Sequence, residues 1–142
     1  MPIITIDQLV DIQPITESQK RLCESYSAGL NIAALGSAGT GKTFITLYNA
    51  IKDVLNAETP YKKVYIVRSL VTTREVGFVL GDTQDKSWLY QVPYQHMVKY
   101  MFQMSSDTEF ENLYRNLKQQ DIIDFWSTSF LRGTTLDDAI II

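Results

Sequence analysis

The sequence has little of what marks several large classes of protein. It contains a single cysteine, Cys23, so no disulfide framework can form within one chain, and no cluster of metal-ligating residues stands out. No apolar run approaches the ~20 residues that span a bilayer. The N-terminus also lacks the basic and apolar regions of a signal peptide. We therefore expect a soluble, cytoplasmic protein with no membrane partner.

Positive charge is also in short supply. The chain has 13 Lys and Arg residues against 16 Asp and Glu residues, which gives a formal net charge of -3. This balance provides no bulk basic footprint for nucleic acid, although it leaves room for a local basic groove. The 142 residues, 45% of them hydrophobic, suit a single globular domain.

Apolar residues recur at helical spacing in four segments, which predicts four helices. The predicted helices follow Thr16 as far as Gly29 and then cover residues 44–55, 94–101 and 106–117. Pro93 would lie in the first turn of the third helix, where its missing N–H is tolerated. Ser106 and Glu109 have the spacing of a capping box at the start of the fourth.

Short apolar or β-branched runs predict four strands between these helices. They are residues 30–35, 64–67, 122–129 and 139–142. Because crossover segments separate them, we expect a parallel sheet with helices on both faces, an α/β fold. The two tryptophans and eight tyrosines are expected in the core of this fold rather than on a stacking platform.

One motif carries specific chemistry. Residues 36–43 read G-S-A-G-T-G-K-T and match the P-loop pattern G-x-x-x-x-G-K-[ST]. The glycines let the backbone curl so that its N–H groups point at phosphates, and the following helix turns its positive end to the same anion. The predicted nucleotide-binding residues are Gly36, Ser37, Ala38, Gly39, Thr40, Gly41, Lys42 and Thr43.

Within this motif two side chains have their own roles. Lys42 should reach the β- and γ-phosphates as a point charge, and the Thr43 hydroxyl should ligate Mg²⁺. These are the two residues to which a catalytic role is assigned, with Thr43 as the metal ligand. The apolar run before the motif and the amphipathic helix after it supply the strand–loop–helix context that the chemistry requires. ATP with Mg²⁺ is therefore the expected ligand.

Gln19 is a second candidate, 17 residues before Gly36 and on the inward face of the first predicted helix. Its side-chain amide both donates and accepts hydrogen bonds, so it can read the edge of an adenine. The spacing from Thr16 also fits a capping box, in which Gln19 only satisfies a backbone N–H. The spacing alone leaves both interpretations open.

Three arginines follow predicted strands. Arg68, Arg74 and Arg132 lie just beyond the carboxyl ends of strands, where open α/β sheets bind their ligands. Each can contact phosphate or nucleic acid there, or simply be solvated.

Several segments together resemble the PhoH-like ATPase family. They are T-E-S-Q-K-R-L at 16–22, the P-loop, V-Y-I-V-R-S-L-V-T-T-R-E-V-G-F-V-L-G-D at 64–82 and F-L-R-G-T-T-L-D-D-A-I-I-I at 130–142. The P-loop is shared by many families, whereas G-F-V-L-G-D and L-R-G-T-T-L-D-D-A are more specific. The resemblance covers nearly the whole chain from about Thr16.

The resemblance implies a RecA-like core similar to that of superfamily 1 helicases, in which the glutamine matching Gln19 contacts adenine. It implies an ATPase with suspected action on RNA or single-stranded nucleic acid. The family occurs in bacteria and bacteriophages, and the modest length of this chain suggests a phage-encoded member. The oligomeric state stays open.

The sequence departs from the family in one respect. In the family, the strand matching residues 139–142 continues into the Walker B acidic pair, and this sequence ends before that pair. We therefore expect one P-loop NTPase domain over residues 1–142, incomplete at its C-terminal side, that hydrolyses little or no ATP alone. The alternatives are a nucleotide-binding module without turnover and, less favoured, a P-loop kinase.

Overall fold

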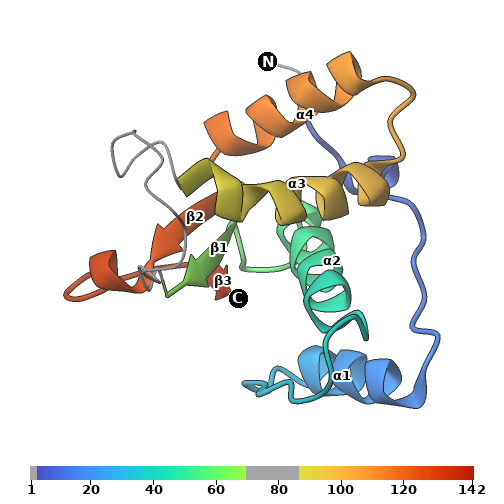
Figure 1. Cartoon of the computed structure of the whole chain (residues 1–142), viewed down its shortest axis with the longest axis vertical. Coiled ribbons are helices and arrows are strands. Elements are labelled where there is room, and N and C mark those ends of the chain that lie inside the picture. The colour runs from blue at the N-terminus through green and yellow to red at the C-terminus, as the bar shows by residue number, and fades with distance from the viewer. Residues whose placement is uncertain (1–2, 70–86) are drawn as a thin grey trace, which may run out of the picture.

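The computed structural model describes residues 3–69 and 87–142, and its element order confirms most of the predicted helices and strands (Figure 1). In chain order the elements are η1 (Ile6–Gln8), α1 (Glu17–Ser27), α2 (Lys42–Leu55), β1 (Lys63–Arg68), α3 (Ser87–Phe102), α4 (Asp107–Gln119), β2 (Ile123–Ser127), η2 (Thr128–Phe130) and β3 (Ala139–Ile141). In the described part of the chain, no helix is both long and apolar enough to cross a membrane.

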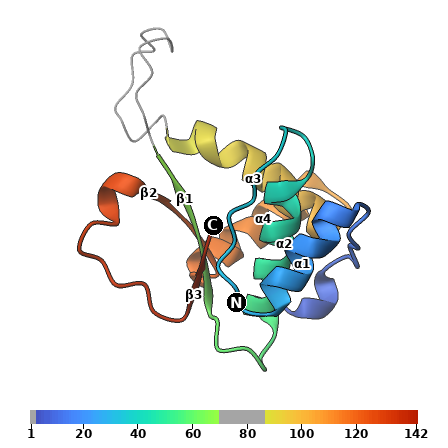
Figure 2. The same ribbon diagram turned by 90° about the horizontal axis from the view of Figure 1, so that it is seen from below.

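The three strands form a parallel sheet in the order β2-β1-β3. In the register of the sheet, Val64 of β1 lies opposite Ile123 of β2 and Ile140 of β3. A strand, a crossover and a parallel strand in sequence order are the pattern of an α/β domain. The predicted α/β fold with a parallel sheet is confirmed, whereas the helices of the described residues lie on one side of the sheet and not on both faces (Figure 2).

One apolar core joins the sheet to α2, α3 and α4, which lie on the same side of it (Figure 2). Each helix contributes residues at helical spacing, so its apolar stripe faces the core. The fully buried members include Leu47 and Ile51 of α2, Val98 of α3 and Leu117 of α4. The stripe predicted for residues 110–117, made of Phe110, Leu113, Tyr114 and Leu117, is entirely buried.

The prediction of a strand over residues 30–35 is wrong. The structure has no strand there, and Figure 1 shows the chain looping beside α1 before it enters α2. Leu30 is 62% exposed and Leu35 is 94% exposed. An apolar run becomes a buried strand only if a neighbouring strand accepts its backbone hydrogen bonds. Among the described residues, β3 pairs only with β1, and no strand is placed to pair with this segment.

The expected start of the third helix is also wrong. The sequence predicts Pro93 in the first turn, but α3 begins at Ser87 and Pro93 lies inside the helix. Proline removes one backbone hydrogen bond and usually ends or kinks a helix. Here the helix includes Tyr94 and Val98, whose side chains are buried in the core. The turn before Pro93 has a contact of its own, because the Lys118 ammonium group donates to the side-chain oxygen of Gln91 at 3.2 Å.

The two predicted polar caps, one at the start of α1 and one at the start of α4, are both present in a modified form. The Ser106 hydroxyl accepts the Glu109 N–H at 3.2 Å, as in a capping box. The Glu109 carboxylate accepts the N–H of Ser105 instead of that of Ser106. At α1, Thr16 accepts the N–H of Gln19 at 3.2 Å. These caps satisfy backbone donors that the first turn of a helix leaves free.

Helix α1 has no buried residue and is held to α2 mainly by polar contacts. The Tyr26 hydroxyl donates to the Asp53 carboxylate at 2.9 Å, and the Asn49 amide donates to the Cys23 sulfur at 3.4 Å. Burial, followed by the hydrogen bond to Asp53, raises the pKa of Tyr26 well above its usual value near 10. The phenol therefore stays neutral and keeps donating to Asp53 at physiological pH.

Replacing Tyr26 with phenylalanine should lower the free energy of unfolding by about 1–2 kcal/mol, because a half-buried carboxylate loses its donor. A raised folded-state pKa stabilises the fold fully below pH ~10 and loses that contribution only as the pH rises further. The loss caused by Tyr26→Phe should therefore be constant between pH 6 and 9, as measured by urea unfolding. Tyr100→Phe, at a 68% exposed tyrosine, is the control. Equal stability of the two variants would show that the Tyr26–Asp53 hydrogen bond does not stabilise the fold.

Candidate functional site

The P-loop residues form an exposed turn that leads directly into α2, as the motif predicts. Gly39 and Gly41 have φ values of +76° and +80°, in the left-handed region that favours glycine. Gly41 is the N-cap of α2, and its lack of a side chain leaves the helix end uncapped. The N–H of Ile45 makes a helical bond to the Gly41 carbonyl. By helix geometry the N–H groups before Ile45 face outward at this end, where they can bind an anion.

The side chain of Lys42 folds back into the concave side of this loop. Its ammonium group donates to the carbonyl of Gly36 at 3.0 Å, to the carbonyl of Ser37, and to the hydroxyl of Thr40 at 3.2 Å. The Thr40 hydroxyl in turn donates to the Ser37 carbonyl. The charge therefore lies at the centre of the turn, next to the free end of α2. Phosphate oxygens entering the loop would meet this ammonium group and the helix N–H groups together.

Thr43 lies in the first turn of α2 and is half-buried. Its position next to Lys42 puts a hydroxyl oxygen beside the phosphate-binding turn. Mg²⁺ prefers oxygen ligands and is commonly bound through one or two protein groups together with substrate phosphates. The described residues hold no cluster of three or more His, Cys, Asp or Glu side chains suited to a metal ion. A hydroxyl oxygen at this position is the kind of ligand that Mg²⁺ takes together with nucleotide phosphates.

Gln19 connects the P-loop to the segment that precedes α1. Its amide oxygen accepts the N–H of Ile15 at 2.8 Å, and its amide nitrogen donates to the Thr40 carbonyl at 3.1 Å. A primary amide has two N–H donors and two lone pairs, so one of each is left. The capping-box interpretation is met in part. The Thr16 hydroxyl accepts the Gln19 N–H, but the Gln19 amide oxygen accepts the N–H of Ile15 and not that of Thr16. The same side chain also faces a pocket.

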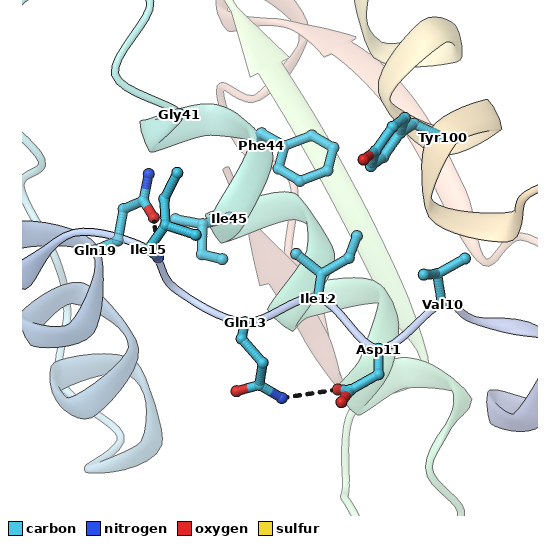
Figure 3. Close-up of a pocket in the computed structure, with 10 residues that line it drawn as sticks. All are labelled: Val10, Asp11, Ile12, Gln13, Ile15, Gln19, Gly41, Phe44, Ile45 and Tyr100. Carbon is cyan, nitrogen blue, oxygen red and sulfur yellow. Dashed lines mark hydrogen bonds between the residues drawn. The ribbon is translucent and has the colours of Figure 1, made fainter.

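This pocket, of about 320 Å³, lies against the start of α2 (Figure 3). Its lining residues come from four parts of the chain: the segment before α1, the first turn of α1, the start of α2 and the end of α3. They are Val10, Asp11, Ile12, Gln13, Ile15, Gln19, Gly41, Phe44, Ile45 and Tyr100. Ligand pockets are mostly apolar with a few polar groups and run from ~300 Å³ upward. The pocket is therefore at the lower end of the size range of ligand sites.

The segment that forms one wall of the pocket is fixed by backbone contacts. The Tyr48 hydroxyl donates to the Val10 carbonyl at 2.9 Å and accepts the N–H of Ile12 at 3.2 Å. The N–H of Val10 donates to the carbonyl of Met101 at 2.8 Å. Tyr48 is buried in the core, so this wall is fixed to both α2 and α3. A preformed wall lowers the entropy that a ligand would lose on binding.

Of the three arginines predicted at strand ends, the two that the structure describes, Arg68 and Arg132, do not line this pocket. Arg68 is the last residue of β1, and its guanidinium lies 6.0 Å from the centre of the Tyr94 ring. Arg132 is exposed after η2. Arg74 and the segment G-F-V-L-G-D at 77–82 lie outside the described residues.

The sequence reasoning missed Ile15 and Tyr100 as pocket residues. Tyrosines were expected in the core, and Tyr48, Tyr94 and Tyr114 are indeed buried, but Tyr100 is 68% exposed. The available signal was its position: Tyr100 lies off the apolar stripe that includes Val98 and Met101. Its ring lies outside the core and forms an edge-to-face pair with the ring of Phe44, 5.7 Å between the ring centres.

The family model for PhoH-like protein matches residues 11–142, which is nearly the whole chain. The chain belongs to the PhoH family. This confirms the family resemblance and the P-loop NTPase fold that it implies. The matched range contains Gln19, the P-loop and all three strands of the sheet.

Individual members of the PhoH family support the same assignment. The chain is 26% identical over 145 residues to the PhoH-like protein of Mycobacterium leprae, covering 99% of this chain and 39% of that protein. It is 30% identical over 112 residues to the PhoH-like protein of Bacillus subtilis, covering 78% of this chain and 32% of that protein. The chain thus spans about two fifths or less of the length of these curated relatives.

Proposed function

We propose that this domain binds ATP, with its triphosphate in the P-loop at residues 36–43. The observation that carries the proposal is the position of the Lys42 ammonium group, bonded to Gly36, Ser37 and Thr40 inside the turn at the open end of α2. A positive charge, a helix N-terminus and a glycine-rich turn at one place form a binding site for a polyphosphate. Membership of the PhoH family supports this proposal.

In this proposal each P-loop residue has a defined task. The backbone of residues 36–41 surrounds the phosphates, Lys42 neutralises part of their charge, and the Thr43 hydroxyl supplies a protein ligand for Mg²⁺. A Mg²⁺ ion held there would supply positive charge against the repulsion among the phosphate oxygens. Ser37 and Ala38 would take part through their backbone, as the Ser37 carbonyl already does in accepting bonds from Thr40 and Lys42.

The nucleic-acid partner is a further part of the proposal. The family resemblance supports RNA or single-stranded nucleic acid. Arg68 is the last residue of β1 and Arg132 follows β2 and η2, where such a strand would approach. Phosphate turnover measured with and without single-stranded RNA tests this point. Turnover that RNA raises supports an RNA-coupled ATPase. ATP binding without any turnover supports a nucleotide-binding module.

Gln19 is proposed to read the adenine edge with the N–H and lone pair that its bonds to Ile15 and Thr40 leave over. Gln19→Ala should then weaken ATP binding by about fivefold or more and GTP binding by less, since a net hydrogen bond is worth ~1 kcal/mol. Competition against a fluorescent ATP analogue measures both affinities.

Thr16→Ala is the matched control for Gln19→Ala, because it removes the cap of the same helix while leaving the Gln19 amide in place. It should affect ATP and GTP equally. If Gln19→Ala also weakens the two nucleotides equally, Gln19 only holds the P-loop to the segment before α1, and the adenine assignment is wrong.

A further inference from the structure

Two aromatic side chains lie beside the P-loop without a role in phosphate binding. Phe44 is in the first turn of α2, two residues after Lys42, and Tyr100 is near the end of α3. Their ring centres are 5.7 Å apart, and the ring planes meet at 69°, an edge-to-face pair. Figure 3 shows Gln19 and Ile15 at one end of the pocket and Tyr100 at the other, with Phe44 between them.

The two rings differ in how accessible they are. Phe44 is half-buried and packs against the core, whereas Tyr100 is 68% exposed. The backbone that carries Tyr100 is nevertheless well fixed, because the adjacent Met101 and Phe102 are 0% and 3% exposed. An accessible ring on a rigid helix can stack on a ligand with little loss of conformational entropy.

We propose that Tyr100 contacts the base of the bound nucleotide, so that the pocket between α1, α2 and α3 holds a purine ring. This inference rests on the proposed function, because it assumes a triphosphate in the P-loop. The pocket and the P-loop share Gly41, and Phe44 follows it within one turn, so phosphates and base would lie on opposite sides of the start of α2.

The chemistry of the pocket suits a purine better than a pyrimidine. Stacking on an aromatic ring is available to every base, since every base has a π-face. A purine, with two fused rings, presents a larger face than a pyrimidine. Ile15, which is 86% exposed, adds an apolar side chain at the opposite end of the pocket. In this arrangement Tyr100 sets the affinity for purines in general, and Gln19 distinguishes adenine from guanine.

The experiment compares a ligand that has a base with one that has none. ATP and inorganic tripolyphosphate, each with Mg²⁺, are titrated into the parent chain, Tyr100→Ala and Tyr100→Phe by isothermal calorimetry. Stacking on one aromatic side chain predicts at least about fivefold weaker ATP binding for Tyr100→Ala. Tripolyphosphate affinity should not change in that variant. Tyr100→Phe should bind ATP like the parent, because it keeps the ring.

The matched control is Tyr90→Ala, which removes a tyrosine of the same helix that is 38% exposed and does not line the pocket. It should leave both affinities unchanged. If Tyr100→Ala binds ATP as well as the parent does, or loses ATP and tripolyphosphate equally, the base-contact proposal is wrong while the P-loop assignment stands. If the parent binds neither ligand, it is the proposed function that fails.

Discussion

Lys42→Ala should weaken binding of a non-hydrolysable ATP analogue by about ten- to a hundredfold. The ammonium group lies inside the P-loop turn, where it contacts the carbonyls of Gly36 and Ser37. Charged hydrogen bonds to a ligand contribute ~1.5–3 kcal/mol, and each 1.4 kcal/mol is a factor of ten in affinity. Alanine removes both the charge and its donors. Isothermal titration at fixed Mg²⁺ measures the difference.

A matched lysine on the same helix separates this effect from a general change of charge. Lys52 is exposed in the last turn of α2, far along the helix from the P-loop. Lys52→Ala should bind the analogue like the parent, and both variants should unfold at nearly the parent temperature. Equal affinity of Lys42→Ala and the parent would refute the P-loop assignment.

Leu47→Ala should destabilise the fold by about 2–5 kcal/mol. Leu47 is 0% exposed and lies in the core where α2 meets β1. Removing three buried carbon atoms loses their transfer free energy and leaves a cavity that the close-packed neighbours fill only in part. Urea unfolding followed by circular dichroism gives the free energy of unfolding for parent and variant.

Leu35→Ala is the matched control for Leu47→Ala, because it makes the same chemical change at a side chain that is 94% exposed. It should change stability by less than about 0.5 kcal/mol. This pair also tests the structure of residues 30–35. If Leu35→Ala costs as much as Leu47→Ala, the segment is a buried strand, as its apolar run indicated, and the exposed loop is incorrect.

The helices and the P-loop could be predicted because their signals are local. The stripe from Phe110 to Leu117 repeats at helical spacing, and any stable helix there has to bury it. The P-loop turn has left-handed backbone at Gly39 and Gly41, and glycine adopts this conformation readily. That preference belongs to the residues themselves. Such features need no knowledge of the rest of the chain.

The parts that could not be predicted depend on distant partners. Residues 30–35 have the composition of a strand, but a strand also needs a neighbour in the sheet, which composition does not reveal. The pocket beside Gly41 brings together residues 10–15 and Tyr100, about 90 positions apart in the sequence. The contacts of Tyr48 with Val10 and Ile12, which hold the segment before α1 across α2, have no signal in the local sequence.

Binding of a triphosphate in the P-loop is tested most directly by amide chemical shifts. The uniformly ¹⁵N-labelled chain is titrated with a Mg²⁺ complex of a non-hydrolysable ATP analogue, and the perturbed amides are assigned. If the triphosphate binds in the P-loop, the largest chemical-shift changes are expected at the N–H groups of Gly39, Gly41, Lys42 and Thr43, at the turn and the open end of α2. Unchanged shifts at these residues, with saturation elsewhere or none at all, would contradict it.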